Sequence, residues 1–401
     1  MKKLALAALL ILFALALRCW QLGLIPKMYF DEFHYVYDAL KFLNGLLPLE
    51  RGSAATPKHP LLPVALIQFA ISLFGNNYLG WRIFPVLLGT GSVVFMFLLA
   101  RELFSFRAAA IATFLLSIDF LHLLLSRVAM VDIFGFFFML GGYYFLARSL
   151  KDERSAGILL AGLFFGLSLA CKLPFFIPVL AALAIYSHTK TPPQAARHFG
   201  VGIYLTQSCD RSKSRNGLLY LFFTPLIVLV LVSAYLNFSA GMTLRAWTEF
   251  EVVNLINTLK FSYVHPFATP AWTWPLVLLP TPFVLIDLGH GLVSLVFAFG
   301  NPLVYWPLVP VMLYLIRQYL RSRNSSLSFV LIGFWFAYLL WLSYDLLGGR
   351  HLFFYYFLPL LPFYLLGLAY LLDKLMFSRR GRLLAALYLL LVFLAFIYYS
   401  P

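Results

Sequence analysis

This sequence of 401 residues is poor in charged residues. Charged residues make up 11% of the chain, and only 15 residues are acidic. Apolar residues make up 62%, whereas an ordinary soluble protein is about 45–50% apolar. This shortage of charge excludes an ordinary soluble globular protein and indicates a polytopic membrane protein.

Cysteine is scarce too, with three in the whole chain. They form no even framework and no metal-ligand spacing, so neither a disulfide nor a zinc site is expected. Alternation of polar and apolar residues is also lacking, since runs such as 218–236 are apolar on every face. That excludes a β-barrel and leaves helices as the membrane scaffold.

Apolar runs of membrane-spanning length predict an all-α polytopic membrane protein with about eleven transmembrane helices. The predicted spans are 4–20, 79–99, 108–124, 130–147, 156–170, 175–186, 218–237, 303–316, 329–344, 353–372 and 383–399. The net charge of +15 is spread between these runs and forms no basic stripe. It therefore indicates topology rather than nucleic-acid binding. Short basic loops place the N-terminus in the cytoplasm and the C-terminus outside.

The chain is expected to be a single membrane domain, 1–401, with no appended soluble domain. Its first extracytoplasmic loop is 21–78, in which the 15-residue apolar run 60–74 is too short to cross and fits an interfacial helix. A basic cytoplasmic loop follows at 187–216. The fourth outer loop, 238–301, is long and is expected to carry interfacial structure as well. Asp287, Gly289 and His290 interrupt its apolar stretch 275–299, which is therefore placed at the outer interface.

Two adjacent carboxylates, Asp31 and Glu32, follow the first span by about ten residues. Neighbouring residues on a helix point about 100° apart, so the two cannot act on the same atom. They are either solvated loop acids at a membrane surface or the acidic part of an active site. The scarcity of acids and the surrounding sequence favour the active site.

Several cations are predicted to lie on the same outer side as this acidic pair. They are Arg18, Lys27, Lys41, Arg51, Lys58, Arg82, Arg127, Lys172, Arg245, Lys260 and Arg350. Arg127 is the strongest candidate for a lipid phosphate, because a guanidinium in a tight turn can hold a phosphate through two hydrogen bonds. The alternative is an interfacial arginine that reaches lipid headgroups. Asp132 is expected to orient Arg127 or to pair with Lys172.

Lys58, His59, Arg18, Lys172 and Arg350 are weaker phosphate-binding candidates, supported by their common side of the membrane.

Asp119 and His122 lie one helical turn apart inside an apolar span, either as a proton path or as a structural pair. The structural pair is favoured. Asp31, Glu32, His34 and Asp38 could hold a hard divalent cation, but no cluster of metal ligands stands out, so no cofactor is required.

Six ordered blocks resemble the protein O-mannosyltransferase family, within the GT-C group of polyprenyl-phosphate-dependent glycosyltransferases. The blocks are Phe30-Asp31-Glu32-Phe33-His34, Lys58-His59-Pro60-Leu61, Ser126-Arg127-Val128-Ala129-Met130-Val131-Asp132, His265-Pro266-Phe267 with Trp272-Thr273-Trp274-Pro275, Gly300-Asn301-Pro302 with Trp306, and Arg350 with Phe353-Phe354-Tyr355-Tyr356-Phe357-Leu358-Pro359. They cover nearly the whole chain in the family's order.

The resemblance implies a GT-C fold of about eleven helices and an extracytoplasmic active site. The implied reaction moves mannose from a polyprenyl (dolichyl-type) phosphate to Ser or Thr hydroxyls of a protein, with inversion at the sugar carbon. By similarity, Asp31 is the general base, Glu32, Arg18 and Arg127 are site residues, and Asp132 and His265 support them. The implied partners are the lipid donor, a protein acceptor and membrane lipids; family members often pair, which leaves a dimer open.

Three departures from the family's pattern are visible. Pro60-Leu61 stands where two consecutive prolines are usual, Tyr356 replaces a common His, and the inserted lumenal domain of eukaryotic members is absent, as in a prokaryotic member. Two other functions stay open. One is a GT-C relative that moves another sugar, such as an aminosugar, to a lipid or glycan. The other is a transporter, although no inverted repeat is visible.

Overall fold

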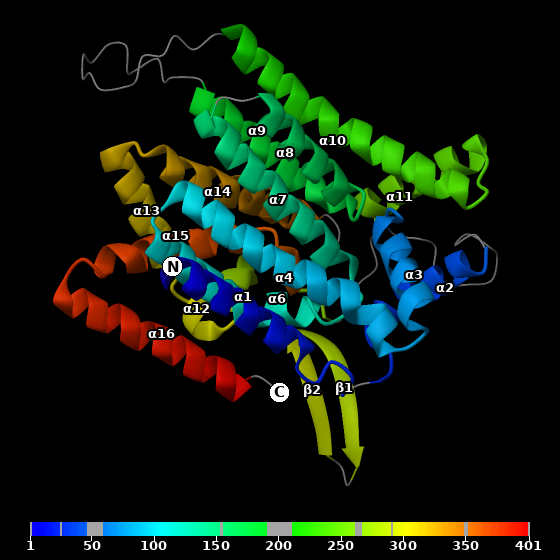
Figure 1. Cartoon of the computed structure of the whole chain (residues 1–401), viewed down its shortest axis with the longest axis horizontal. Helices are drawn as coiled ribbons and strands as arrows, with labels where there is room; N and C mark the ends of the chain where they lie inside the picture. Colours follow the sequence, from blue (N-terminus) through cyan, green and yellow to red (C-terminus); the bar gives the residue numbers. More distant parts are fainter. Residues whose placement is uncertain are drawn as a thin grey trace.

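A computed structural model describes residues 2–24, 26–45, 59–152, 155–190, 211–260, 267–289, 292–348 and 352–399. Within these ranges the protein is a layered bundle of helices from which one β-hairpin projects (Figure 1). The α-helices are α1 (Lys2–Cys19), α2 (Glu32–Leu43), α3 (Leu62–Phe74), α4 (Tyr78–Leu103), α5 (Phe106–Ser117), α6 (Phe120–Leu125), α7 (Val131–Asp152), α8 (Ser155–Leu169), α9 (Phe176–Lys190), α10 (Arg211–Ser239), α11 (Leu244–Lys260), α12 (Pro302–Tyr305), α13 (Leu308–Ser322), α14 (Ser325–Leu346), α15 (Leu361–Leu375) and α16 (Arg379–Tyr399). Three 3₁₀ turns, η1 (Leu173–Phe175), η3 (Ala271–Leu276) and η4 (Phe354–Phe357), and two strands, β1 (Thr281–Gly289) and β2 (Leu292–Ala298), complete the described elements.

Helices of membrane-spanning length dominate the described part of the chain. Seven are long and apolar enough to cross a bilayer: 78–103, 131–152, 173–190, 215–239, 302–322, 325–346 and 379–399. Three shorter apolar helices, α3, α5 and α8, accompany them. The predicted class, a helical polytopic membrane protein, is confirmed. The count of eleven spans, the loop boundaries and the orientation of the termini stay predictions.

The predicted span 108–124 is two helices rather than one. α5 ends at Ser117, and α6 begins only at Phe120. Asp119 lies between them with extended backbone, and its carboxylate accepts a hydrogen bond from the His122 backbone N–H at 2.9 Å. An aspartate that caps a helix start satisfies an otherwise unpaired N–H, and here it restarts the helix within the apolar run.

The outer segment 275–299 contains a β-hairpin, which is a departure from an all-α fold. β1 and β2 pair antiparallel, from Thr281 opposite Ala298 to Gly289 opposite Leu292. The valine, isoleucine and phenylalanine residues of these runs favour strands, whereas their leucines are compatible with either structure. The hairpin extends away from the helices in Figure 1, while its base lies close to α6. The interfacial helix expected at 60–74 in the first outer loop corresponds to α3, whereas the segment 275–299 expected at the interface in the fourth outer loop holds the end of η3 and the hairpin instead of a helix. The membrane depth of both segments stays a prediction.

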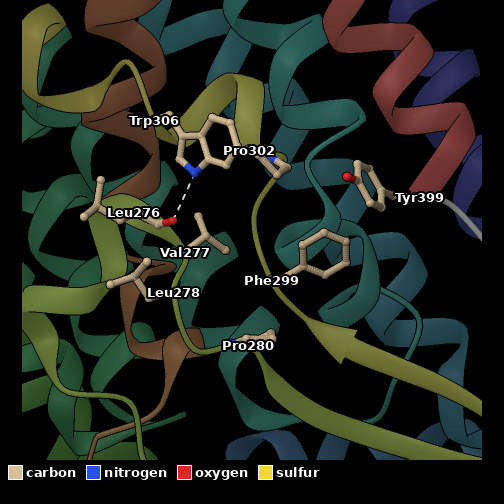
Figure 2. A pocket seen from close by; sticks show the side chains of 8 residues that line it. All are labelled: Leu276, Val277, Leu278, Pro280, Phe299, Pro302, Trp306 and Tyr399. Carbon is tan, nitrogen blue, oxygen red and sulfur yellow. Dashed lines mark hydrogen bonds between the residues drawn. The ribbon is translucent and has the colours of Figure 1, made fainter.

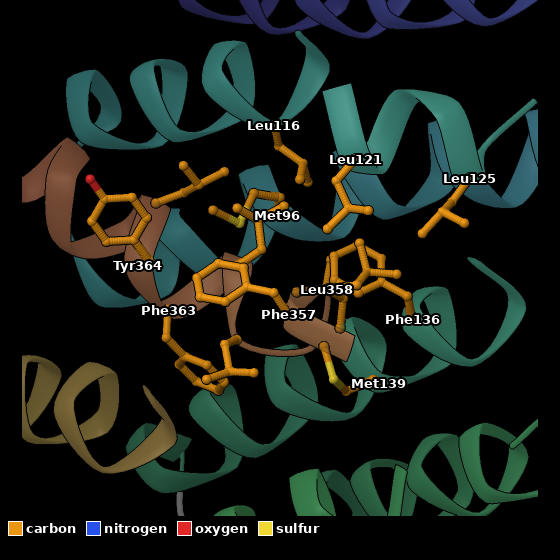
Figure 3. Packing of buried hydrophobic residues seen from close by; sticks show 14 of the residues in the cluster. Met96, Leu116, Leu121, Leu125, Phe136, Met139, Phe357, Leu358, Phe363 and Tyr364 are labelled. Carbon is orange, nitrogen blue, oxygen red and sulfur yellow. The ribbon is translucent and has the colours of Figure 1, made fainter. Parts of the chain in front are cut away.

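The core lies between α4, α6, α7 and α15, with η4 running into it. Figure 3 shows Phe357 and Leu358 packed among Met96, Leu121 and Phe136, and all five are fully buried or nearly so. The η4 motif is thus fixed in the helical core.

Close approach of α7 and α8 depends on a glycine. A methyl group added at Gly141 would clash with the ring of Phe164. Small residues that let helices approach each other are typical of membrane bundles.

Candidate active site

Glu32 opens α2 and is fully buried. Its carboxylate accepts two hydrogen bonds from Arg82 of α4: Arg82 Nε to Oε1 at 2.9 Å and Arg82 Nη2 to Oε2 at 2.8 Å. Both side chains are essentially without solvent exposure, at 0% and 1%. A buried acid of this kind is stable only with a charged partner in good geometry, and the two-pronged guanidinium contact provides it.

The same carboxylate joins α2 to the turn that carries Arg127. Glu32 Oε1 also accepts a hydrogen bond from the backbone N–H of Ala129 at 3.1 Å. This turn runs from Ser126 to Met130, between α6 and α7. Glu32 thus orients a cation and a backbone segment at once. We therefore assign Glu32 a positioning role. The catalytic role predicted for it from the sequence stays a prediction.

Arg82 also binds backbone carbonyl groups of the segment that leads to the acidic pair. It donates to the carbonyl oxygens of Leu22 at 3.1 Å and Lys27 at 2.9 Å, and its guanidinium lies 4.8 Å from the centre of the Tyr29 ring. Burial raises the pKa of Tyr29 to about 12 even beside this cation, so its hydroxyl stays protonated. Sequence reasoning placed Arg82 on the outer side but not in the site. The missed signal is an arginine that starts an otherwise apolar helix.

Asp31 occupies the position just before α2 and is partly buried. The side chain of a residue in this position often caps the helix N-terminus, but the Asp31 carboxylate makes no capping hydrogen bond. It is therefore not committed to the helix start. Its neighbour Glu32 is anchored to Arg82, which limits the movement of Asp31 itself.

Arg127 lies half-buried in the Ser126–Met130 turn, as predicted, and donates from Nη2 to the carbonyl oxygen of Trp20 at 2.6 Å. Burial lowers the pKa of Arg127, and the charge of Arg82 acts in the same direction. An arginine nevertheless stays protonated near neutral pH. The turn thus presents a fixed positive charge.

Lys172 and Asp132 form a second buried ion pair. Lys172 Nζ lies 2.7 Å from Asp132 Oδ1, and the two side chains are 4% and 6% exposed. The ammonium also lies 5.1 Å from the ring centre of Tyr355 and 4.8 Å from that of Tyr356. Of the two partners expected for Asp132, the structure pairs it with Lys172. A carboxylate and two aromatic rings together stabilise a buried lysine charge.

Arg18 is buried completely near the end of α1. It donates to the Ala14 carbonyl at 2.7 Å, and its Nη2 lies 2.8 Å from His122 Nδ1. Asp119 in turn caps α6 at His122, so the geometry of Asp119 and His122 is that of the structural pair favoured from the sequence. With no exposed surface, Arg18 braces α1 against α6 in this arrangement. Its predicted contact with a donor phosphate would require movement of these neighbours.

Of the remaining predicted site residues, one packs in the interior and three lie outside the described residues. His59 is buried, and its ring lies 6.3 Å from that of Tyr35 of α2, so it packs on the helix that starts at the acidic pair. Lys58, His265 and Arg350 lie outside the described residues. Among the described residues, no group of three His, Cys, Asp or Glu side chains is placed to hold a metal ion.

An apolar hollow of about 580 Å³ lies between η3, α12 and the end of α16. Figure 2 shows Trp306 and Leu276 facing each other across one wall, joined by a 3.0 Å hydrogen bond from the indole N–H to the Leu276 carbonyl oxygen. The other lining residues are Val277, Leu278, Pro280, Phe299, Pro302 and Tyr399. None of the predicted carboxylates or cations contributes to it, so this hollow does not suit a phosphate.

Comparison with known proteins supports the resemblance drawn from the motifs. Residues 58–198 match the family model of dolichyl-phosphate-mannose-protein mannosyltransferases. A polyprenol-phosphate-mannose–protein mannosyltransferase of Corynebacterium glutamicum is 24% identical over 93% of this chain and 84% of that protein. The protein of the same name from Mycobacterium tuberculosis is 25% identical over 87% of this chain and 76% of its own length. The predicted resemblance is confirmed, and the relatives' names agree with the predicted class of enzyme.

Solved structures share the fold. The Saccharomyces cerevisiae protein O-mannosyltransferase Pmt1-Pmt2 complex with bound sugar donor matches with a TM-score of 0.82 at 12% identity, over the whole of this chain and 90% of that chain. ArnT from Cupriavidus metallidurans bound to undecaprenyl phosphate matches with a TM-score of 0.61 at 16% identity, over 97% of this chain and 62% of that one. These likenesses show the GT-C fold.

Proposed function

We propose that this GT-C membrane protein, related to the protein O-mannosyltransferases, transfers mannose from a polyprenyl phosphate to Ser or Thr hydroxyls of proteins. Asp31 is the general base, and Arg127 receives the phosphate. The reaction takes place at the outer membrane face and inverts the configuration at the sugar carbon. The names of the relatives and the ordered motif blocks support the donor and the acceptor class.

One observation carries the assignment of the site. Asp31 is adjacent to Glu32, whose Oε1 binds the Ala129 backbone N–H, two residues beyond Arg127. The proposed base and the proposed phosphate-binding cation therefore belong to one hydrogen-bonded unit. A transferase that uses a lipid phosphate donor needs such a fixed spacing, because the hydroxyl attacks one side of the sugar carbon while the phosphate leaves from the other.

The chemistry requires a single base. The acceptor oxygen forms a bond to the sugar carbon, the bond from that carbon to the phosphate oxygen breaks, and the hydroxyl proton passes to the Asp31 carboxylate. General-base assistance of this kind contributes about 10²–10⁴ in rate. The phosphate gains negative charge as it leaves, so a preplaced guanidinium at Arg127 stabilises the transition state more than the bound donor. No general acid is needed, in contrast to the carboxylate pair of a glycosidase.

A second candidate keeps the fold and changes the substrates. This candidate takes another sugar from polyprenyl phosphate to a lipid or glycan, and ArnT, which shares the fold and was solved with undecaprenyl phosphate bound, supports the lipid carrier that both candidates use. Acceptor choice depends on local loops rather than on the fold, so the shared architecture leaves both candidates open to test.

The deciding experiment supplies the purified full chain with radiolabelled mannosyl-phosphate polyprenol and a Ser/Thr-rich peptide. We expect labelled peptide from the wild type and none from Asp31→Asn, while donor binding is retained. Asp38→Asn is the matched control, since it removes a carboxylate from the same helix outside the proposed machinery. Transfer to lipid and not to peptide would reject the proposed acceptor. Full turnover by Asp31→Asn would reject the base.

A further inference from the structure

Phe30, the residue just before Asp31, has an unusual backbone conformation. Its φ is +53°, in the left-handed region that residues with a side chain seldom adopt. Asp31 then has φ −69° and ψ −9° and leads directly into α2. A left-handed residue persists only when its surroundings hold it, and such residues are concentrated at functional sites. The direction in which Asp31 enters the helix thus depends on how Phe30 is held.

Two aromatic rings from distant segments hold Phe30. Its ring is stacked on Phe283 of β1, with centroids 4.1 Å apart and planes 16° apart. The ring of Tyr355 in η4 meets Phe30 edge-on at 6.2 Å and meets Phe283 edge-on at 6.2 Å. Phe283 and Tyr355 are both 5% exposed, so this cluster of three rings, the Phe30 clamp, is a packed unit.

The clamp also touches the second buried ion pair. Tyr355, which meets the Phe30 ring, lies under the Lys172 ammonium at 5.1 Å, and Lys172 is paired with Asp132. On its other side, Asp31 is followed by Glu32 and its bonds to Arg82. Asp31 is therefore held between two anchors, an aromatic one before it and an ionic one after it.

We propose that Phe30 is a positioning residue for Asp31: the clamp formed with Phe283 and Tyr355 keeps Phe30 left-handed and so aims the Asp31 carboxylate at the acceptor hydroxyl. This inference rests on the proposed function, in which Asp31 is the base. Without the clamp, the backbone of Phe30 relaxes to a negative φ and the peptide before Asp31 turns. The Asp31 carboxylate is then no longer aligned with the acceptor hydroxyl.

The test compares the steady-state kinetics of full-length variants with a mannosyl-phosphate polyprenol and a Ser/Thr peptide. Phe30→Leu and Phe283→Leu each remove a ring of the clamp. For both we expect kcat to fall by up to about 10²-fold, the loss typical of small misplacements at reacting groups, with the KM for the donor close to wild type. The double variant should lose no more than the worse single one, because the two rings act together.

Two further variants separate the ring from the backbone. Phe30→Tyr keeps a stacking ring and should retain nearly full kcat. Phe30→Gly adopts the left-handed conformation freely but has no ring to clamp, so its kcat should stay low. Phe69→Leu, from an aromatic pair with Phe84 in which the rings lie 6.3 Å apart, is the control and should behave as wild type.

Wild-type kcat in Phe30→Leu and Phe283→Leu would overturn the proposal. Wild-type kcat in Phe30→Gly would also overturn it, because the left-handed conformation would then suffice without the ring. A change confined to the KM for the donor would overturn it as well. A failure of the proposed function gives a different pattern. If Asp31→Asn turns over normally, the base assignment fails together with this inference, whereas an inactive Asp31→Asn with an active Phe30→Leu rejects the inference alone.

Discussion

Removing Arg82 should cost far more stability than removing its partner's charge. In Arg82→Met, the Glu32 carboxylate stays buried and keeps only backbone donors, from Ala129 at 3.1 Å and Tyr29 at 3.4 Å. An uncompensated buried charge of this kind costs about 3–5 kcal/mol. In Glu32→Gln, the side chain keeps its shape and an acceptor oxygen, and Arg82 keeps its two backbone carbonyls. That loss is closer to a single charged hydrogen bond, about 1.5–3 kcal/mol.

The double variant is the sharper part of this prediction. Arg82→Met combined with Glu32→Gln leaves no buried charge at the site, so the total loss should be smaller than the sum of the single losses. The measurement is the midpoint of unfolding in detergent, monitored as the fraction of protein that remains monodisperse at increasing denaturant concentrations. Lys151→Met is the control, because both side chains of its pair with Glu102 are solvent-accessible, at 54% and 27%. Such a surface pair is worth about 0–1 kcal/mol.

Equal losses in the two single variants, with a fully additive double variant, would refute this reasoning. They would mean that Glu32 and Arg82 contribute independently and that the buried pair does not hold the site. A loss in Lys151→Met as large as that in Arg82→Met would refute it as well, since burial would then make no difference.

Three further predictions follow from the same geometry. Arg127→Ala should lower kcat and raise the KM for the lipid donor more than that for the peptide, measured against Arg245→Ala at an exposed helix position; equal rises in the two KM values would indicate a structural arginine. Lys172→Met should lower the free energy of unfolding by about 3–5 kcal/mol because it strands the Asp132 carboxylate, and an unchanged free energy of unfolding would contradict the buried pair. Burial raises the pKa of Asp38 to about 6, so this acid favours the folded state below its unfolded pKa and loses that contribution as the pH rises through about 6. Asp38→Asn should therefore remove a pH-dependent loss of up to about 3 kcal/mol between pH 4 and 7, and an unchanged pH profile would contradict this.

The spans that could be predicted from the sequence were those with long, uninterrupted apolar runs, such as α4, α7, α14 and α16. The break at Asp119 could not be placed, because a helix cap inside an apolar run looks like a single buried charge until its hydrogen bond is known. The segment 275–299 was predicted not to span the membrane, which stays a prediction, and its strands were not identified. Valine- and leucine-rich segments are compatible with either structure, and tertiary contacts decide between them.

The candidate site divides in the same way. Asp31, Glu32 and Arg127 could be found from their scarcity and their motifs, and the partner of Asp132 was one of two alternatives. Arg82 could not be assigned, because its bond to Glu32 joins residues 50 positions apart, and the bond from Glu32 to Ala129 spans 97. Nothing local in the sequence brings these segments together. Their proximity results from the packing of α1, α3 and α6 against α4, with α2 packed on α3.

Burial separates two kinds of charged residue in this site. Arg18, Glu32, Arg82, Asp132 and Lys172 are all at least nine-tenths buried, and each contacts another titratable side chain. Such groups are poor candidates for direct reaction with a substrate, because an opposite charge already compensates each member of the Glu32–Arg82 and Asp132–Lys172 pairs, and Arg18 is enclosed between the Ala14 carbonyl and His122. Asp31 and Arg127, by contrast, are only partly buried. If the buried pairs form the frame and the two partly exposed residues react, conservative variants of the frame should reduce stability first, whereas variants of Asp31 and Arg127 should reduce turnover in a protein that stays folded.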